Sequence, residues 1–266
     1  SEDNGHTWSN YNSGSQQNPV SGNFVVALAH QQHEDKNIIW AASWKAEGQD
    51  EEYGISKTEN GGLTWTVHLE GVKAQNIYAD GPNVYVATHE GLYKSPDYGE
   101  TWYLFPPLVD KQNDEKVYAL EFYSVYAQDG TIWTGTADGL ARSSNNGYSW
   151  NIFRAFRQTG QNEEPRTYAY PNPFSSKRHN QLGDEGVVRL QYNVTADANI
   201  TVKIYDFAMD LVATVASDKF RSGPGDYNEV WNGKNDYDDE VANGVYFYSV
   251  QIDGDGTYWG KVLVVN

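Results

Sequence analysis

The chain has 266 residues and a formal net charge of −17, with 36 acidic against 19 basic side chains. This balance excludes duplex nucleic acid as an expected partner, because phosphate binding needs clustered Lys and Arg. The chain contains no Cys, which excludes disulfide bridges and thiolate metal sites. No apolar run approaches the roughly 20 residues of a membrane span, so we predict no membrane insertion.

Four short segments share one pattern, Ser/Thr-x-Asp/Asn-x-Gly-x-Thr/Ser-Trp, and the first of them opens the chain. The segments are SEDNGHTW (1–8), TENGGLTW (58–65), SPDYGETW (95–102) and SSNNGYSW (143–150). Their Trp residues lie 57, 37 and 48 residues apart. An irregular period of this length is typical of propeller blades rather than of helical solenoids.

The intervals between these segments hold short runs of β-forming residues, separated by Gly, Asn or Asp turns. We therefore predict an all-β chain that begins with a partial β-propeller at residues 1–157. It should contain about three four-stranded blades, from about residue 20 onward, preceded by the closing strand of another blade. Closed propellers usually have roughly four to eight blades. We therefore expect upstream blades or a protein partner to cover the apolar sheet faces that remain.

The four segments are predicted to fix turns rather than to perform chemistry. Asp or Asn accepts backbone N–H bonds in a tight turn, Gly permits a positive φ, and Trp anchors the following strand in an apolar layer. The pattern resembles the Asp-box, or BNR, repeat family, which includes sialidases, xyloglucan-type glycosidases, sorting receptors and photosystem assembly factors. That resemblance implies a structural role away from any active centre. The residues concerned are Asp3, Gly5, Trp8, Asn60, Gly62, Trp65, Asp97, Gly99, Trp102, Asn145, Gly147 and Trp150.

A polar, irregular stretch at 158–168 is predicted to be a linker, and residues 169–266 again read as strands. Six or seven short strands in this length favour an antiparallel immunoglobulin-like sandwich. The motifs here are YPNPF (170–174), VKIYDFAMDLVATV (202–215), WNGKNDYDDEVANGVYFY (231–248) and the terminal GKVLVVN (260–266).

These motifs resemble the C-terminal Ig-like domain of the flagellar hook-capping protein and of type IX secretion substrates. FAMD (207–210) departs from that pattern, since the family commonly has a Gly-containing turn there. The resemblance implies an exported protein of the Bacteroidetes or Chlorobi lineage or their relatives, located outside the cell or on its outer surface. It also implies that this domain serves as an export signal.

Several polar clusters contain residue types that could form catalytic or metal sites. No Arg precedes Arg142, so these blades lack the Arg cluster of a sialidase. Loop carboxylates could serve an inverting glycosidase, but we interpret them as solvated charge. They are Asp35, Glu47, Asp50, Glu51, Glu52, Asp110, Asp114 and Glu115. His30, His33 and Glu34 lack the spacing of a helical zinc site.

The acidic stretch NDYDDE (235–240) gathers oxygen ligands within one turn, which suits Ca²⁺. Asp236, Asp238 and Asp239 are the candidate ligands, and the alternative is a hairpin turn whose carboxylates face water. We expect no other cofactor. A second open question concerns a set of aromatic residues that could stack on carbohydrate or pack between blades, and we favour packing. These are Trp40, Trp44, Tyr53 and Trp133.

The function favoured by the sequence is that of an exported, non-catalytic interaction protein. Its propeller would bind a protein or a glycan, and its C-terminal domain would serve export, attachment or docking. One alternative is the C-terminal portion of a secreted glycoside hydrolase whose catalytic residues lie on other blades. Another is an accessory subunit of a larger surface or membrane-associated assembly.

Overall fold

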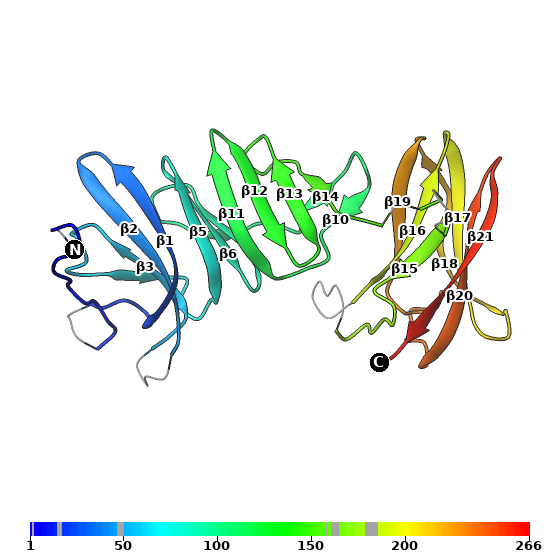
Figure 1. The fold of residues 1–266 in the computed structure, drawn as a ribbon, viewed down its shortest axis with the longest axis horizontal. Helices are drawn as coiled ribbons and strands as arrows, with labels where there is room; N and C mark the ends of the chain where they lie inside the picture. The colour runs from blue at the N-terminus through cyan, green and yellow to red at the C-terminus, as the bar shows by residue number, and fades with distance from the viewer. Residues whose placement is uncertain (2, 15–17, 47–50, 158, 161–164, 179–185) are drawn as a thin grey trace. The chain divides into compact units, whose positions relative to one another are not determined.

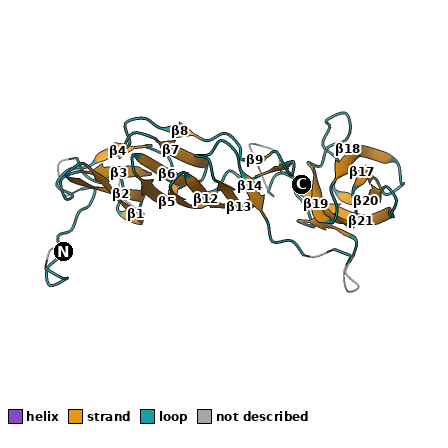
Figure 2. Cartoon of the chain, turned by 90° about the horizontal axis from the view of Figure 1, so that it is seen from above, coloured by secondary structure: helices purple, strands orange, loops and turns teal. Residues whose placement is uncertain are grey.

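The computed structural model describes residues 1, 3–14, 18–46, 51–157, 159–160, 165–178 and 186–266. Contacts divide the chain into two units, Ser1–Arg154 and Ala155–Asn266. The regular secondary structure in the described residues consists of β-strands, as the sequence predicted (Figures 1 and 2). None of these residues forms a helix long and apolar enough to cross a membrane.

The first unit contains three four-stranded antiparallel sheets, each with its strands in chain order (Figure 1). Blade 1 consists of β1 (Phe24–His33), β2 (Lys36–Trp44), β3 (Gly54–Thr58) and β4 (Thr66–His68). Blade 2 consists of β5 (Ala74–Asp80), β6 (Asn83–Thr88), β7 (Gly91–Ser95) and β8 (Tyr103–Leu104). Blade 3 consists of β11 (Phe122–Gln128), β12 (Thr131–Thr136), β13 (Gly139–Ser143) and β14 (Asn151–Phe153). This topology confirms the prediction of a partial propeller.

A short hairpin stands between blades 2 and 3 in the chain, formed by β9 (Val109–Asp110) and β10 (Glu115–Lys116). The stretch 3–14, which carries the first of the four repeated segments, contains a turn and no strand, so the closing strand predicted before blade 1 does not form in these residues.

Strand β6 shows how the alternating sequence builds the stack of blades. Val84 and Val86 point to one side and join a buried cluster with blade 1. Tyr85 and Ala87 point to the other side and join a buried cluster with blade 3. Because successive side chains of a strand face opposite sides of its sheet, a middle blade must be apolar on both faces. The sequence NVYVAT meets that requirement.

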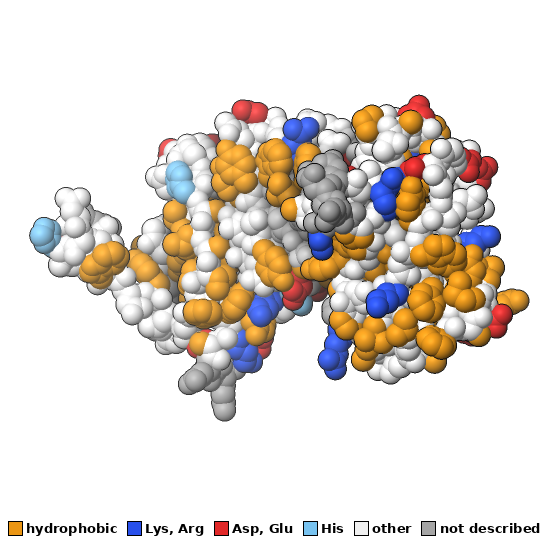
Figure 3. Space-filling view, turned by 45° about the vertical axis from the view of Figure 1, so that its right-hand side comes forward, with side chains coloured by type: hydrophobic (Ala, Val, Ile, Leu, Met, Phe, Trp, Pro, Cys, Tyr) orange, Lys and Arg blue, Asp and Glu red, His pale blue; other side chains and the backbone are white. Residues whose placement is uncertain are grey.

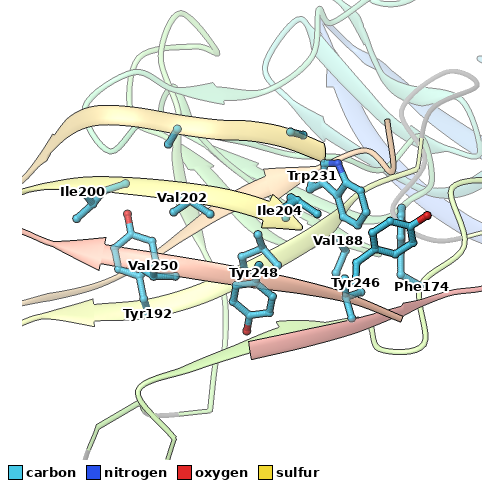
Figure 4. Close-up of a cluster of buried hydrophobic side chains, with 14 of the residues drawn as sticks. Phe174, Val188, Tyr192, Ile200, Val202, Ile204, Trp231, Tyr246, Tyr248 and Val250 are labelled. Carbon is cyan, nitrogen blue, oxygen red and sulfur yellow. The ribbon is translucent and has the colours of Figure 1, made fainter. Parts of the chain in front are cut away.

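The second unit is a two-sheet antiparallel sandwich. One sheet contains β15 (Thr167–Tyr170), β16 (Val188–Val194) and β19 (Gly225–Trp231). The other contains, in spatial order, β18 (Leu211–Arg221), β17 (Ala198–Tyr205), β20 (Gly244–Ile252) and β21 (Gly256–Val264). Figure 4 shows the core between them, where Val188 and Tyr192 of β16 meet Ile200, Val202 and Val250 of the larger sheet.

The YPNPF motif covers one edge of the larger sheet. The Asn172 side chain donates from Nδ2 to the Lys261 carbonyl and accepts from Leu263 N, both at 3.0 Å. Phe174 then pairs with the end of β21, and its ring is fully buried in the core. Exposed strand edges invite pairing with other chains, so this motif protects β21 while it anchors the start of the sandwich.

An acidic residue covers the opposite edge. The backbone N–H of Asp236 donates to the Val212 carbonyl at 3.1 Å, and its carboxylate accepts from Thr214 N at 2.8 Å. Asp236 therefore bonds to β18 much as Asn172 bonds to β21.

Replacing Asn172 tests the edge cover. Asn172→Ala removes two hydrogen bonds to β21, so we expect about 1–2 kcal/mol lower stability in urea unfolding and faster aggregation through the bared edge. Asn172→Asp keeps the acceptor for Leu263 N and loses the donor to Lys261. Its stability should therefore lie between that of the native chain and that of Asn172→Ala. Native stability and native aggregation in Asn172→Ala would contradict the assignment.

Candidate functional site

The repeated segment of blade 2, residues 95–102, is a closed hydrogen-bonded turn. Asp97 accepts from the backbone N–H of Thr101 at 2.8 Å and from its hydroxyl at 2.6 Å. Ser95 donates to Asp97 at 2.8 Å and accepts from Gly99 N at 2.8 Å. The Thr101 hydroxyl and N–H hold the pKa of Asp97 below its ordinary value, because both bonds favour the carboxylate. The Trp102 indole closes the turn by donating to the Gly99 carbonyl.

The first segment, at the N-terminal end of the chain, repeats this arrangement around Asp3. Its carboxylate accepts from Thr7 N at 2.8 Å and from the Thr7 hydroxyl at 2.7 Å. These bonds lower the pKa of Asp3 to about 2. Its Trp8, however, is 78% exposed and anchors no strand.

The two segments that carry Asn keep the same turn with one bond reversed. Asn60 Oδ1 accepts from Thr64 N at 3.0 Å, and its amide donates to the Thr64 hydroxyl at 2.8 Å. Asn145 treats Ser149 in the same way, at 3.0 and 2.9 Å. The hydroxyl is a donor beside Asp and an acceptor beside Asn, because a hydroxyl can do either. All four segments therefore form the same turn, in which the Asp or Asn side chain bonds to the residue four positions later.

The glycines of these turns set the spacing between neighbouring blades. Gly99 has φ +93° and lies against the Trp40 ring of blade 1, where an added Cβ would come within 2.3 Å of a ring carbon. Gly147 has φ +91° and faces Phe105 with the same clearance. Any side chain at these two positions would push the neighbouring blades apart. Glycine is therefore needed here for the close contact between blades as well as for the positive φ.

Each blade also carries a cross-strand pair of an aromatic ring and a basic side chain. The pairs, with distances from the basic group to the ring centroid, are Trp40 and Lys57 (5.6 Å), Tyr85 and Lys94 (5.2 Å), and Trp133 and Arg142 (5.5 Å). The next blade covers the first two pairs, and the rings of Trp40 and Tyr85 are buried. Burial lowers the pKa of Lys94.

In blade 3 no further sheet among the described residues of the first unit covers the corresponding side, and we call it the open face. Its residues are Trp133, Leu140, Arg142 and Phe153. The rings of Trp133 and Phe153 stack with centroids 5.9 Å apart. Leu140 and Phe153 are each at least 40% exposed. Arg142 Nε is shielded from solvent and has no hydrogen-bond partner within the described parts of the chain.

The remaining aromatic candidates do not join the open face in a stacking platform. Trp40 is fully buried between blades 1 and 2. The Trp44 indole donates to the Ala74 carbonyl, and the Lys73 ammonium group lies 4.2 Å from its ring centroid. Tyr53 is partly buried beside β3.

The buried loop carboxylates stabilise backbone groups. Asp110 accepts from the backbone N–H groups of Gln112, Asn113 and Ile152 at 3.1–3.3 Å. Glu51 accepts from Ala46 N at 2.7 Å.

Glu115 is held differently, in an ion pair. It lies 2.5 Å from Arg154, which also contacts Asp138 at 3.0 Å. Asp35, Glu52 and Asp114 are exposed. Glu47 and Asp50 lie outside the described residues.

No group of three or more His, Asp or Glu side chains is placed to hold a metal ion within the described stretches. His30 contacts Asn37, and the His33 ring stacks on Tyr98 at 3.8 Å; Glu34 is exposed beside them.

The candidate calcium ligands lie in a turn and make separate contacts. Asp236 caps β18 and Asp238 pairs with Lys234 at 3.1 Å. Asp239 donates its backbone N–H to Asn235 Oδ1 at 3.0 Å.

Sequence reasoning missed one cavity of about 540 Å³ in the first unit. Lys36, Lys57, Glu59, His68 and Glu100 are among its lining residues. Both lysines bond to Glu59 and lower its pKa to about 2. Burial, aided by the nearby Lys57 charge, lowers the pKa of His68. No pattern along the chain indicates this cavity, because it forms where residues of blade 1 meet Glu100 of blade 2.

No protein-family model matches the chain, and no curated protein matches it. Solved structures similar to it include PorZ, an essential surface component of the type IX secretion system of Porphyromonas gingivalis (19% identity, TM-score 0.32). YCF48 from Cyanidioschyzon merolae (12%, 0.36) and an ancestral GH74 enzyme (13%, 0.39) are also similar. The matches cover 91%, 92% and 91% of this chain, but 30%, 74% and 33% of those proteins. At these values the likeness concerns the fold alone.

Substitutions at Asp97 test the turn chemistry. Asp97→Asn should keep the turn by the reversed bond seen at Asn60, whereas Asp97→Ala should lower the urea midpoint clearly. Because the folded-state pKa of Asp97 lies below its ordinary 3.8, its carboxylate adds stability above that pH and loses it as the pH falls through the folded-state value. The stability gap between the native chain and Asp97→Asn should therefore shift below about pH 4. A constant gap would contradict the assignment.

A matched pair of tryptophans tests the open face. Trp40→Ala should cost about 3–5 kcal/mol in urea unfolding, the usual range for a buried Trp, because its ring is covered by blade 2. Trp133→Ala should cost clearly less, because no further blade covers its ring. Equal losses would show that Trp133 is packed as tightly as Trp40.

Proposed function

We propose that the chain belongs to an exported bacterial surface or extracellular interaction protein. In it, Asp-box propeller blades bind a further blade or a protein partner, and an Ig-like C-terminal domain serves export, attachment or docking. The observation that carries this proposal is the open face of blade 3. The equivalent side of each preceding blade is buried by the next blade. The apolar open face of blade 3 would be buried in the same way only if another sheet or a protein covered it.

The occupant of the open face is expected to resemble a blade. Between blades 1 and 2 the turn glycine Gly99 packs flat against Trp40, so a small residue in a tight turn is what fits over Trp133. Arg142 adds a polar requirement, because its Nε needs an acceptor once it is covered. A partner that brings a carbonyl or carboxylate oxygen beside a flat apolar surface meets both conditions.

The C-terminal unit supports the export part of the proposal through its motifs. YPNPF, which we assign to the sorting-type family, has a defined task in the sandwich, since Asn172 and Phe174 join the first residues of the unit to β21. A domain closed in this way can fold as one body at the C-terminal side of different cargo. Similarity of the motifs to type IX secretion substrates points to the secretion route.

A glycoside hydrolase is the weaker candidate for these residues. An inverting enzyme needs two carboxylates with room for a water molecule between them. Asp110 and Glu51 instead satisfy backbone N–H groups, and Glu115 neutralises Arg154. The structure-bearing roles of these side chains favour binding over catalysis in this part of the protein.

Deletion of the C-terminal unit tests the proposed export role. In a bacterium that has type IX secretion, the chain preceded by a leader for inner-membrane export should reach the cell surface or the medium. Without residues 169–266 it should stay in the periplasm, as measured by protease accessibility on intact cells and by immunoblots of cell fractions. Leu140→Lys, on the open face, is the matched control and should be exported normally. Equal export of the truncated chain would refute the role.

A further inference from the structure

The outer side of the larger sandwich sheet carries aromatic and basic residues in neighbouring positions. Register places Lys203 beside Ser249 and Ser249 beside Trp259, and in the next row Tyr205 beside Phe247 and Phe247 beside Lys261. The inward neighbours Val202 and Ile204 are fully buried in the core. We call the outward set Lys203, Tyr205, Phe247, Trp259 and Lys261 the aromatic–lysine face.

The rings of this face lie on the surface rather than in the core. Trp259 is 51% exposed, and its ring centroid lies 5.4 Å from that of Tyr205, with the planes 42° apart. The small side chain of Ser249 lies between their strands and is buried. Phe207, which is 79% exposed, extends the surface through its contact with Phe247. Figure 3 shows hydrophobic side chains gathered around basic ones on this unit.

The two lysines of the face differ from the other lysines of the same unit. Lys177, Lys219 and Lys234 each lie within 4.0 Å of a carboxylate. Neither Lys203 nor Lys261 has such a partner in the portion of the unit that the structure describes. In a chain with a net charge of −17, two uncompensated ammonium groups beside exposed rings form a local site for an anion.

We propose that the aromatic–lysine face binds an acidic polysaccharide. Its pyranose rings would stack on Trp259 and Tyr205, whose flat apolar bodies suit the C–H faces of sugars. Carboxylate or sulfate groups on the sugars would pair with Lys203 and Lys261, which act as compact positive charges on long stems. This surface belongs to the sandwich and is independent of the open face of blade 3, so the inference extends the proposed function without depending on it.

Other occupants fit these residues less well. A second copy bound through the same face by a two-fold axis would bring the lysines of both copies together, and like charges at an interface oppose association. Duplex nucleic acid needs many more phosphate contacts than two lysines provide, and the acidic remainder of the chain repels it. A sugar polymer with spaced charges requires only the two cations and the rings.

The binding test uses the whole chain and three purified polymers: polygalacturonate with carboxylates, dextran sulfate with sulfates, and neutral dextran. Affinity electrophoresis and calorimetry at low and physiological salt should show binding to an acidic polymer and none to dextran. Binding to polygalacturonate alone identifies the carboxylate as the group recognised, and binding to dextran sulfate alone identifies the sulfate. Equal binding to dextran, or binding to none of the three, overturns the proposal.

Variants then locate the binding surface. Trp259→Ala should weaken binding about tenfold, a loss typical of one stacking ring, while Trp259→Phe should retain most of it. Lys203→Gln and Lys261→Gln should each weaken binding and reduce its salt dependence. Tyr237→Ala and Lys177→Gln change an exposed ring and an exposed cation elsewhere on the same unit and should bind as the native chain does. If the two control variants lost as much affinity as the variants of the aromatic–lysine face, the attraction would be diffuse and the assignment would be overturned.

Discussion

A sheet that is apolar on both sides needs a neighbour on each side, and this requirement organises the first unit. Blade 2 meets it through Val84 and Val86 on one side and Tyr85 on the other. Blade 3 meets it on one side, and its other side presents Trp133 and Phe153 to solvent. The packing that stabilises the middle of the stack therefore also motivates the proposal that its last blade binds a further sheet or a protein.

Short polar side chains fix many turns and strand edges, and in both units they do so by hydrogen bonds to backbone groups. In the blades Asp97 and Asn145 close turns by bonding to backbone and hydroxyl groups four residues ahead. In the sandwich Asn172 and Asp236 bond to the bared edges of β21 and β18. These acidic and amide groups thus satisfy backbone groups that would otherwise lack a partner.

The sequence predicted the features that depend on local patterns. The four turns around Asp3, Asn60, Asp97 and Asn145 follow from residue types within eight positions, and alternation as in NVYVAT marked the strands. It could not predict which carboxylates are structural, because Asp110 meets Ile152 only after the β9–β10 hairpin has packed against β14 of blade 3. The cavity beside His68 depends likewise on how blades 1 and 2 stack, and no pattern along the chain records that arrangement.

Net charge and local surface chemistry act over different distances. The charge of −17 describes the chain as a whole, but screening at physiological ionic strength limits electrostatic reach to about 8 Å. A ligand stacked on Trp259 therefore responds to Lys203 and Lys261 more than to carboxylates on other parts of the chain. The same reasoning applies at the open face, where Arg142 is the charged group beside Trp133. An acidic chain can consequently present local surfaces of basic and aromatic residues, and its net charge disfavours duplex nucleic acid without excluding a sugar polymer whose anionic groups meet only those two lysines.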